Sequence, residues 1–256
     1  MTIFYYTATG NSLYVAKKLG GTLLSIPQVL KSGNTHYADD VIGIVYPCYA
    51  YGLPASIKDF FAKVTWEAKY SFAVITYGFM IGAAYLNLEQ TAQAAHKQFD
   101  YVSKILMVDN YLLGFEMDKE RRKEPKKNIE GSIKALAGDI AARKKQLPKV
   151  GATQRFINFA SDKALDKRIG KDFANHFDVS SACTKCGICT KVCPTGNITI
   201  KDGALTYASR CECCMACMHA CPQNAIHIQK EKSGKRFRNQ HVTLKEIIAS
   251  NDRSDK

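Results

Sequence analysis

The stretch Cys211–Pro222 reads "CECCMACMHACP" and holds five cysteines in twelve residues. Four of them follow a fixed spacing: two residues separate Cys211 from Cys214, two more lead to Cys217, and three lead to Cys221, which is followed by proline. An earlier stretch, 183–194, reads "CTKCGICTKVCP" and repeats this spacing with the same final proline. Two copies of one pattern indicate that this part of the chain folds around its cysteines.

The repeated spacing fits the binding of 4Fe-4S clusters. A C-x2-C-x2-C loop can bring thiolates to three iron corners of one cube, and the fourth thiolate must come from elsewhere in the chain. In the bacterial two-cluster arrangement, the distal Cys before Pro binds the other cluster. This rule predicts two crossed sets of ligands: Cys183, Cys186, Cys189 and Cys221 for one cluster, and Cys211, Cys214, Cys217 and Cys193 for the other.

Structural zinc is the competing interpretation, because zinc sites also use pairs of cysteines. Tetrahedral zinc sites usually show two separated C-x-x-C hooks rather than a triple hook with a distal Cys-Pro, so two exact copies favour iron and sulfur. Cys213 lies outside the pattern, and we expect a small buried thiol or a weak donor near cluster sulfur. His219 is not expected to be a ligand, since every iron corner already has a thiolate. Residues 183–222 resemble the bacterial-type two 4Fe-4S ferredoxins, including "CPTGNI" and "CPQNAI" after the distal cysteines.

The rest of the chain must fold in another way. Of its 256 residues, only one cysteine, Cys48, precedes position 183, so the first part depends on ordinary hydrophobic burial. We expect a first domain over 1–146, a helical linker over 147–178, the cysteine domain over 179–231 and a tail over 232–256. The linker is predicted from apolar residues at helical intervals: Phe156, Phe159, Leu165, Ile169, Phe173 and Phe177. In the tail, "KEKSGKRFRNQ" looks exposed and "TLKEIIAS" suggests a short final helix.

The N-terminal sequence and the net charge indicate the cell compartment and the class of binding partner. "MTIFYYTATG" lacks the features of a secretory signal, and no apolar run approaches the roughly 18 residues of a membrane span, so we expect a cytoplasmic protein without membrane insertion. Thiols in that reducing compartment favour metal or redox chemistry over disulfides. The net charge of +13 favours acidic redox partner proteins, while the absence of a zinc finger or RNA-binding signature disfavours nucleic acid. A solvated basic face is the simpler alternative, and the sequence leaves the oligomeric state open.

The first domain alternates apolar strands with amphipathic helices. This alternation predicts an α/β fold with a parallel sheet and helices on both faces. The interval 111–127 is charged, contains Pro125 and has no clear periodicity, so we interpret it as an insertion or mobile loop. The expected strands are 1–6, 41–47, 70–78 and 101–108, and the expected helices are 13–20, 53–64, 84–99 and 128–147.

The loop after the first strand is the strongest candidate for binding a small molecule. Ligands of open parallel sheets bind at the carboxyl ends of the strands, and "TATGNS" at 7–12 comes between a strand and a helix. Its hydroxyls, its Asn amide and the free N–H groups of the helix start can enclose a phosphate, although the same residues could simply cap the helix. No G-x-G-x-x-G follows the first strand, which disfavours a nicotinamide dinucleotide.

These residues resemble the flavodoxin family, whose phosphate loop is a T/S-x-T-G-N-T/S stretch after the first strand. The resemblance covers about 1–146 and implies a doubly wound sheet of order 2-1-3-4-5 with bound FMN. Carried over by position, it places the phosphate against Thr7, Thr9, Gly10, Asn11 and Ser12. The aromatic and glycine-rich loops "PCYAYGLP" and "YGFMIGAAY" supply weaker candidates for contact with the flavin ring: Tyr49, Tyr51, Gly52, Tyr77, Gly78 and Phe79.

A flavodoxin-like domain followed by a small α+β two-cluster domain is similar to the flavodoxin-ferredoxin fusion electron-transfer proteins of anaerobes. The resemblance implies two 4Fe-4S clusters that relay electrons to or from FMN. An electron carrier is favoured over an enzyme, because no set of catalytic acids, bases or nucleophiles stands out. Two alternatives remain: an FMN-dependent oxidoreductase that reduces a small acceptor, with 111–127 shaping its pocket, and an iron-sulfur redox sensor whose basic face contacts nucleic acid.

Overall fold

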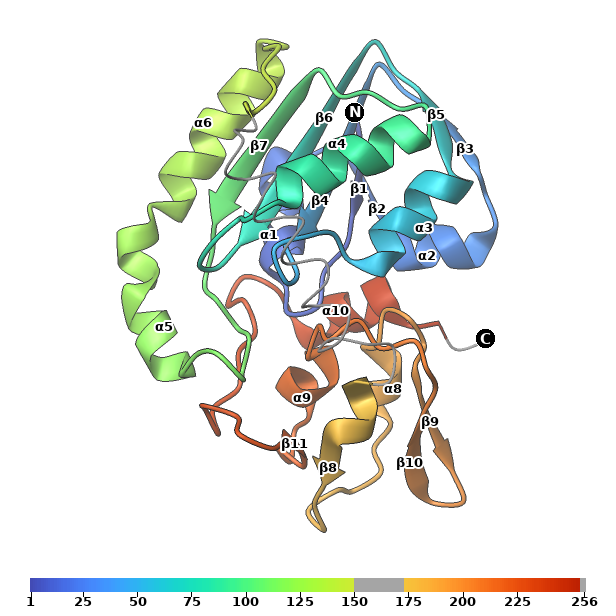
Figure 1. The fold of residues 1–256 in the computed structure, drawn as a ribbon, viewed down its shortest axis with the longest axis vertical. Helices are drawn as coiled ribbons and strands as arrows, with labels where there is room; N and C mark the ends of the chain where they lie inside the picture. Colours follow the sequence, from blue (N-terminus) through green and yellow to red (C-terminus); the bar gives the residue numbers. More distant parts are fainter. Residues whose placement is uncertain (150–172, 254–256) are drawn as a thin grey trace.

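A five-stranded parallel sheet forms the centre of the first domain (Figure 1). The computed structural model describes residues 1–149 and 173–253. The sheet order is β2-β1-β4-β6-β7, and every neighbouring pair is parallel. Numbered along the chain within this sheet, the order is 2-1-3-4-5, as expected. The strands are β1 (Thr2–Tyr5), β2 (Thr22–Ser25), β4 (Val41–Pro47), β6 (Tyr70–Tyr77) and β7 (Tyr101–Leu106).

Helices cover both faces of this sheet and bury its side chains in two apolar layers. On one face, α1 (Asn11–Leu19) and α6 (Ile129–Ala141) contribute residues such as Leu13 and Leu136. On the other face lie α2 (Ile26–Ser32), α3 (Ala55–Lys63) and α4 (Ala84–Ala94). The continuous apolar runs of β4 and β6 are explained by this arrangement, because strands in the middle of a parallel sheet are covered on both sides.

Several elements of the first domain differ from or add to the sequence prediction. The edge strand β2 supplies the fifth strand that the predicted order required. A separate pair of short parallel strands joins β3 (His36–Ala38) to β5 (Thr65–Glu67). The interval 111–127 is not an unstructured loop: it forms α5 (Met117–Lys123) and the 3-10 helix η1 (Glu124–Lys127). Glu116 caps α5 by accepting hydrogen bonds from the backbone N–H groups of residues 118 and 119.

The cysteine domain is a small α+β unit built from two antiparallel strand pairs and two short helices. Strand β8 (Phe177–Val179) pairs with β11 (Ile226–Ile228), and β9 (Ile198–Lys201) pairs with β10 (Ala204–Tyr207). The helices are α8 (Ile188–Lys191) and α9 (Ala216–Ala220). Most of the predicted linker helix lies at 150–172, outside the described residues. Its described end is the 3-10 helix η2 (Phe173–His176), where Phe173 is buried.

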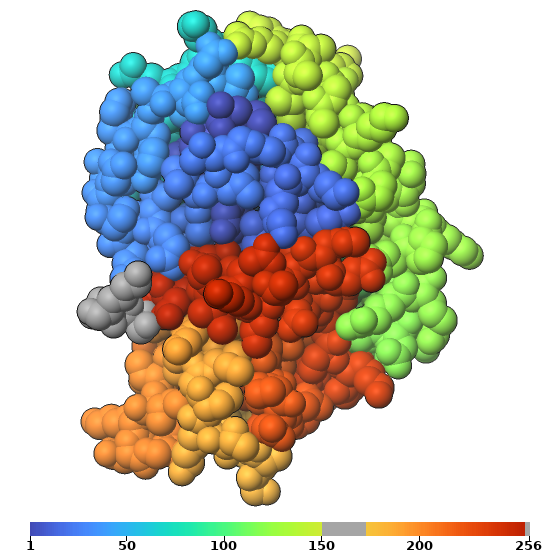
Figure 2. All heavy atoms as spheres, turned by 180° about the vertical axis from the view of Figure 1, so that it is seen from behind, coloured from blue at the N-terminus to red at the C-terminus, as the bar shows by residue number. Residues whose placement is uncertain are grey.

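The segment after the cysteine domain returns to the sheet domain. Its last helix, α10 (Leu244–Asn251), is the predicted short final helix and begins with a capping box of Thr243 and Glu246. The expectation that residues 230–240 are exposed holds only in part, because Ser233, Phe237 and Asn239 are buried while others, such as Lys235 and Arg238, are exposed. Figure 2 shows the C-terminal residues in red as a band between the blue N-terminal half and the orange cysteine domain. Among the described residues, no helix has the length and apolar character needed to cross a membrane.

Candidate functional site: two cysteine cavities and a flavin-sized cavity

The cysteines of the first triple hook surround one small cavity together with the distal cysteine of the second copy. Cys183, Cys186, Cys189 and Cys221 all line it. Gly187 lies within this hook, between Cys186 and Cys189, adopts the left-handed region at φ 75° and starts helix α8. Four cysteine thiolates are the donor set that a 4Fe-4S cluster requires. The structure therefore brings together the four residues predicted for one cluster; we name this the distal cluster cavity.

The second triple hook forms an equivalent cavity on the side facing the sheet domain. Its thiol lining is Cys193, Cys211, Cys214 and Cys217, the other predicted set. Met215 takes the place of Gly187, since it also adopts a left-handed conformation, at φ 56°, immediately before helix α9. The crossed pairing means that each half of the domain supplies one cysteine to the other half. We name this the proximal cluster cavity.

A third and larger cavity of about 330 Å³ lies where the sheet domain meets the cysteine domain. Its walls come from four loops at the carboxyl ends of β1, β4, β6 and β7, together with the second cysteine hook. Of the predicted flavin contacts, the lining includes Thr7, Thr9, Asn11, Ser12, Tyr49, Tyr51, Tyr77, Gly78 and Phe79. Gly10 and Gly52 are not lining residues; they support the backbone of the two loops that are.

The phosphate loop leaves the start of α1 available to an anion. Gly10 precedes the helix in a left-handed conformation, at φ 101°, and no side chain caps the helix. The first turn carries no acidic residue. Uncapped N–H groups and the positive end of the helix dipole favour a phosphate at this position, by up to about 2 kcal/mol for the dipole when partly buried. The simple capping role that the sequence allowed for "TATGNS" is thus not what its side chains do.

The side chains of this loop divide into hydroxyls that can donate and groups that hold the loop in place. Thr7 Oγ1 accepts from the Gly10 N–H at 3.1 Å, and Thr9 Oγ1 accepts from Asn110 Nδ2 at 2.8 Å. Because each oxygen accepts here, its hydrogen can donate to a phosphate. By contrast, Ser12 shares a hydrogen bond with the Thr76 hydroxyl at 2.8 Å, and the Asn11 amide donates to Val108 O.

Aromatic residues dominate the part of the cavity where a flavin ring would lie. Tyr49 and Gly52 close a tight turn through two mutual backbone hydrogen bonds of 3.2 and 2.8 Å. The two residues between them, Ala50 and Tyr51, both have positive φ, at 48° and 67°. Strained backbone of this kind is concentrated at ligand sites, where it sets the direction of side chains. At the rim, Phe79 is 61% exposed, and the centroid of its ring lies 5.8 Å from that of the Phe115 ring.

The loop after β7 contributes a wall that the sequence motifs did not indicate. Asp109, Asn110 and Tyr111 line the cavity. Asp109 packs so closely on Gly78 that a Cβ at Gly78 would come within 2.3 Å of its carboxylate, and burial raises the pKa of Asp109. The signal that could have found this wall was the position of the loop at a strand's carboxyl end, next to the "YGFMIGAAY" loop.

A buried lysine from η1 supports the same wall. Lys127 Nζ donates to Gly78 O at 3.0 Å and to Met107 O at 2.7 Å. Burial lowers the pKa of Lys127, while the buried carboxylate of Glu120 lies 3.8 Å from its ammonium group. The segment 111–127 thereby fixes the ends of β6 and β7, which is a structural role that its charged sequence concealed.

The second cysteine hook supplies the remaining wall through Glu212, Cys213, Cys214 and Met215. Glu212 Oε1 accepts from both the backbone N–H and the hydroxyl of Ser56, at 2.5 and 2.8 Å, at the N-terminal turn of α3. Its Oε2 accepts from the Tyr6 hydroxyl at 2.5 Å. Three hydrogen bonds from the sheet domain therefore hold the cysteine hook against the cavity. Three residues, Glu212, Cys214 and Met215, line this cavity and the proximal cluster cavity at once.

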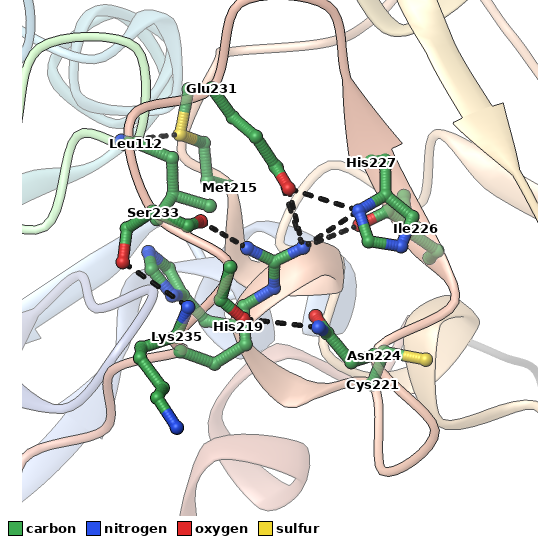
Figure 3. Close-up of polar contacts among 12 residues, drawn as sticks. Leu112, Met215, His219, Cys221, Asn224, Ile226, His227, Glu231, Ser233 and Lys235 are labelled. Atoms are coloured by element: carbon green, nitrogen blue, oxygen red, sulfur yellow. Dashed lines mark hydrogen bonds and ion pairs between the residues drawn. The ribbon is translucent and has the colours of Figure 1, made fainter. Parts of the chain in front are cut away.

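Contacts on the other side of helix α9 fix the cysteine domain to the loop after β7. Leu112 N–H donates to Met215 Sδ at 3.3 Å, a contact drawn in Figure 3. His219 Nε2 lies 2.8 Å from Asn110 O, and its Nδ1 accepts from Phe237 N–H at 3.0 Å. Burial lowers the pKa of His219 to about 4, so the ring is neutral at pH 7. Both ring nitrogens are used by backbone groups, which agrees with the expectation that His219 is not a ligand.

Residues 182–239 match the family model of the 4Fe-4S dicluster domain. The chain joins a flavodoxin-like domain to a dicluster ferredoxin domain. The family match identifies the dicluster domain, and the strand order 2-1-3-4-5 is that of the flavodoxin-like fold. The chain is also similar to the polyferredoxin protein MvhB of Methanothermus fervidus, with 41% identity over 44 residues. That match spans 17% of this chain and 11% of the relative.

Two solved structures align with parts of the chain. One is a candidate flavoprotein from Bacteroides uniformis, with 15% identity, 47% of this chain and 95% of that chain covered, and a TM-score of 0.32. The other is the Trp repressor binding protein from Bacillus subtilis, with 10% identity, 54% and 96% covered, and a TM-score of 0.33.

Proposed function

We propose that this protein relays electrons between two 4Fe-4S clusters and FMN within one chain. The observation that carries the proposal is the shared wall of Glu212, Cys214 and Met215, which leaves single residues between the proximal cluster cavity and the flavin-sized cavity. When bound, the clusters pass electrons singly and FMN holds one or two, so their combination joins one-electron and two-electron chemistry. The order FMN, proximal cluster, distal cluster is supported by the linings, because the flavin-sized cavity shares three residues with the proximal cluster cavity and none with the distal one.

The residues of this chain fit such groups in their donor chemistry. The uncapped start of α1 and the hydroxyls of Thr7 and Thr9 suit the phosphate of FMN. The tyrosine-rich turn and the Tyr77–Phe79 loop suit a planar ring. The Tyr49 hydroxyl is buried and has no protein partner among the described residues, so a polar edge of the ring would supply one.

We also propose that the partner is an acidic redox protein, in a reducing cytoplasm. Helix α5 and η1 expose Lys119, Arg122, Lys123 and Lys126. They adjoin the cavity rim, because the neighbouring Lys127 is bonded to Gly78 O beside the exposed Phe79. Opposite charge speeds the encounter, and the apolar rim offers contact once the partner has docked.

A second candidate function is reduction of a small acceptor at the flavin. The observation in its favour is the apolar rim, where Phe79 and Met80 are 61% and 51% exposed next to the cavity. A planar, quinone-like acceptor could rest on such a surface. Turnover of a quinone or nitroaromatic compound at a rate independent of any protein partner would favour this function over the carrier.

The proposal is tested by anaerobic purification with iron, sulfide and flavin quantified per chain. We expect two 4Fe-4S clusters and one FMN. Adding excess FMN to the purified protein checks whether flavin was lost during purification. Full cluster content without any flavin binding after this addition would contradict the relay and leave a ferredoxin alone.

A further inference from the structure

The residues Phe237–Asp252 form what we call the C-terminal belt. They leave the dicluster domain beside His219, cross the phosphate loop and end on the flavodoxin-like domain as helix α10. Figure 2 shows this band between the two domains. The belt is anchored on the sheet side by the bond between Tyr5 OH and Ser250 Oγ at 2.8 Å and by the ion pair of Lys17 with Glu246 at 2.6 Å.

Asn239 packs the belt onto the phosphate loop. Its backbone N–H donates to Thr9 O at 2.9 Å, and its side-chain Nδ2 donates to Asn11 Oδ1 at 3.1 Å. Asn239 and Val242 also fill the space beside Gly10, because a Cβ at Gly10 would come within 3.0 Å of each. Asn239 is 5% exposed, so these bonds are made away from solvent. The conformation of the phosphate loop thus depends on Asn239, which lies far along the chain from the flavodoxin-like domain that contains the loop.

Asn251 connects the phosphate loop to the segment that precedes Cys193 of the proximal cluster cavity. The side chain is fully buried, and its Nδ2 donates to Thr7 O at 2.9 Å and to Val192 O at 3.2 Å. Val192 directly precedes Cys193, which lines the proximal cluster cavity. One amide group therefore touches both the segment that would bind the FMN phosphate and the segment that supplies a cluster thiolate.

We propose that the C-terminal belt couples FMN binding to retention of the proximal cluster, with Asn239 and Asn251 as positioning residues. The inference rests on the proposed function, since it needs FMN at the 7–12 loop. When FMN orders the phosphate loop, Thr7 O fixes the position of Asn251, and Asn251 in turn fixes the segment that contains Cys193. In the reverse direction, a cluster that orders the Cys193 segment fixes the phosphate loop through the same amide. Coupling between two binding sites is reciprocal by thermodynamic necessity, so each cofactor should stabilise the other.

Two quantities measure this coupling in the full chain under anaerobic conditions. One is the dissociation constant of FMN, from the quenching of its fluorescence. The other is the rate at which a ferrous chelator removes iron, with and without saturating FMN. Wild type is compared with Asn251→Ala and Asn239→Ala. Gln240→Ala is the matched control, because Gln240 is an exposed belt residue whose Nε2 lies 3.5 Å from the imidazole Nε2 of its neighbour His241.

In wild type we expect FMN to slow removal of the proximal cluster by roughly fivefold to a hundredfold, which is the typical coupling of two binding affinities when it appears in the rate of iron loss. Asn251→Ala should bring this ratio close to one and weaken FMN, while Gln240→Ala should match wild type. Asn239→Ala should weaken FMN and reduce the ratio, and it decides the matter if Asn251→Ala does not fold.

Two results would overturn the belt proposal while leaving the electron relay intact: a ratio of one in wild type that binds FMN, or an unchanged ratio in both folded variants. Failure of wild type to bind FMN at all would instead remove the proposed function, and the belt proposal with it.

Discussion

At the residue scale, the backbone of Gly10 determines the shape of the phosphate loop. Its φ of 101° is one that L residues rarely adopt, and the belt leaves no room for a side chain. Gly10→Ala should therefore cost about 1–2 kcal/mol for the left-handed backbone alone. We expect it also to weaken FMN binding, because the loop must shift away from Asn239 and Val242.

Gly33→Ala is the matched control for this change. Gly33 also has a positive φ, of 74°, at the end of α2, but nothing lies within 4 Å of its added Cβ. Both variants should lose stability in chemical denaturation, and only Gly10→Ala should lose flavin affinity in a titration. Equal FMN affinity in the two variants would mean that the loop is not where FMN binds.

Cys213 carries a second prediction at this scale. Its side chain lines the flavin-sized cavity, whereas the proximal cluster cavity is lined by the four cysteines predicted for it. Cys213→Ala should therefore retain full iron content but alter the absorbance of bound flavin. Cys214→Ala is the comparison, and it should lose one cluster. An iron deficit in Cys213→Ala equal to that of Cys214→Ala would show that Cys213 is a ligand.

At the scale of elements, helix α10 depends on its first turn to stay docked. Thr243 Oγ1 accepts from Glu246 N–H at 3.2 Å, and the Glu246 carboxylate accepts from Thr243 N–H at 2.7 Å. The ion pair with Lys17 and these bonds lower the pKa of Glu246 to about 2, so the cap is charged at pH 7. Thr243→Ala should cost about 1 kcal/mol and raise hydrogen exchange in α10. Lys245→Ala, on the same turn, should leave the exchange unchanged; equal exchange in both variants would contradict the role of the cap.

The sequence predicted the elements whose signal is local. Strands β4 and β6 are continuous apolar runs, and their bounds agree with the prediction to within a residue. Strand β2 was not predicted, because its four residues at the edge of the sheet form no continuous apolar run. Helix α5 was not predicted either, because its charged residues face solvent and only two of its residues, Met117 and Glu120, are buried. Its cap, Glu116, precedes a pattern with no visible period.

The candidate site divides in the same way. The cysteine spacing and the 7–12 loop were readable because each motif lies within a few residues. The wall formed by Glu212 and the belt that supports the phosphate loop were not, because they depend on partners more than 150 residues away, such as Ser56 for Glu212 and Thr7 for Asn251. Polar residues such as Asn239 looked exposed, and only their distant backbone partners make burial favourable.

At the scale of the whole molecule, the net charge of +13 should appear in the rate of association. With an acidic ferredoxin or flavodoxin as donor, the bimolecular rate should fall as salt rises, because screening shortens the reach of the charges. Lys119→Glu with Arg122→Glu on α5 should flatten this dependence. The control is Lys201→Glu with Lys230→Glu, which makes the same change in charge at two exposed positions of the dicluster domain. Equal effects of the two pairs would mean that the charge acts without a preferred surface.

The arrangement of the three cavities leads to a prediction about the path of electrons. Cys217 lines only the proximal cluster cavity, so Cys217→Ala should damage that cluster while the flavodoxin-like domain retains FMN. Cys186→Ala should damage the distal cluster in the same way and leave the wall shared with the flavin cavity untouched. Rapid mixing with a reduced low-potential protein donor should then show slow reduction of flavin in Cys217→Ala.

In wild type, electron transfer from the proximal cluster to flavin should be fast and independent of protein concentration. Cys186→Ala should retain this internal step once its proximal cluster is reduced. Flavin reduction at the wild-type rate in Cys217→Ala would place the proximal cluster off the path, and an internal step that depends on protein concentration would mean that electrons pass between molecules.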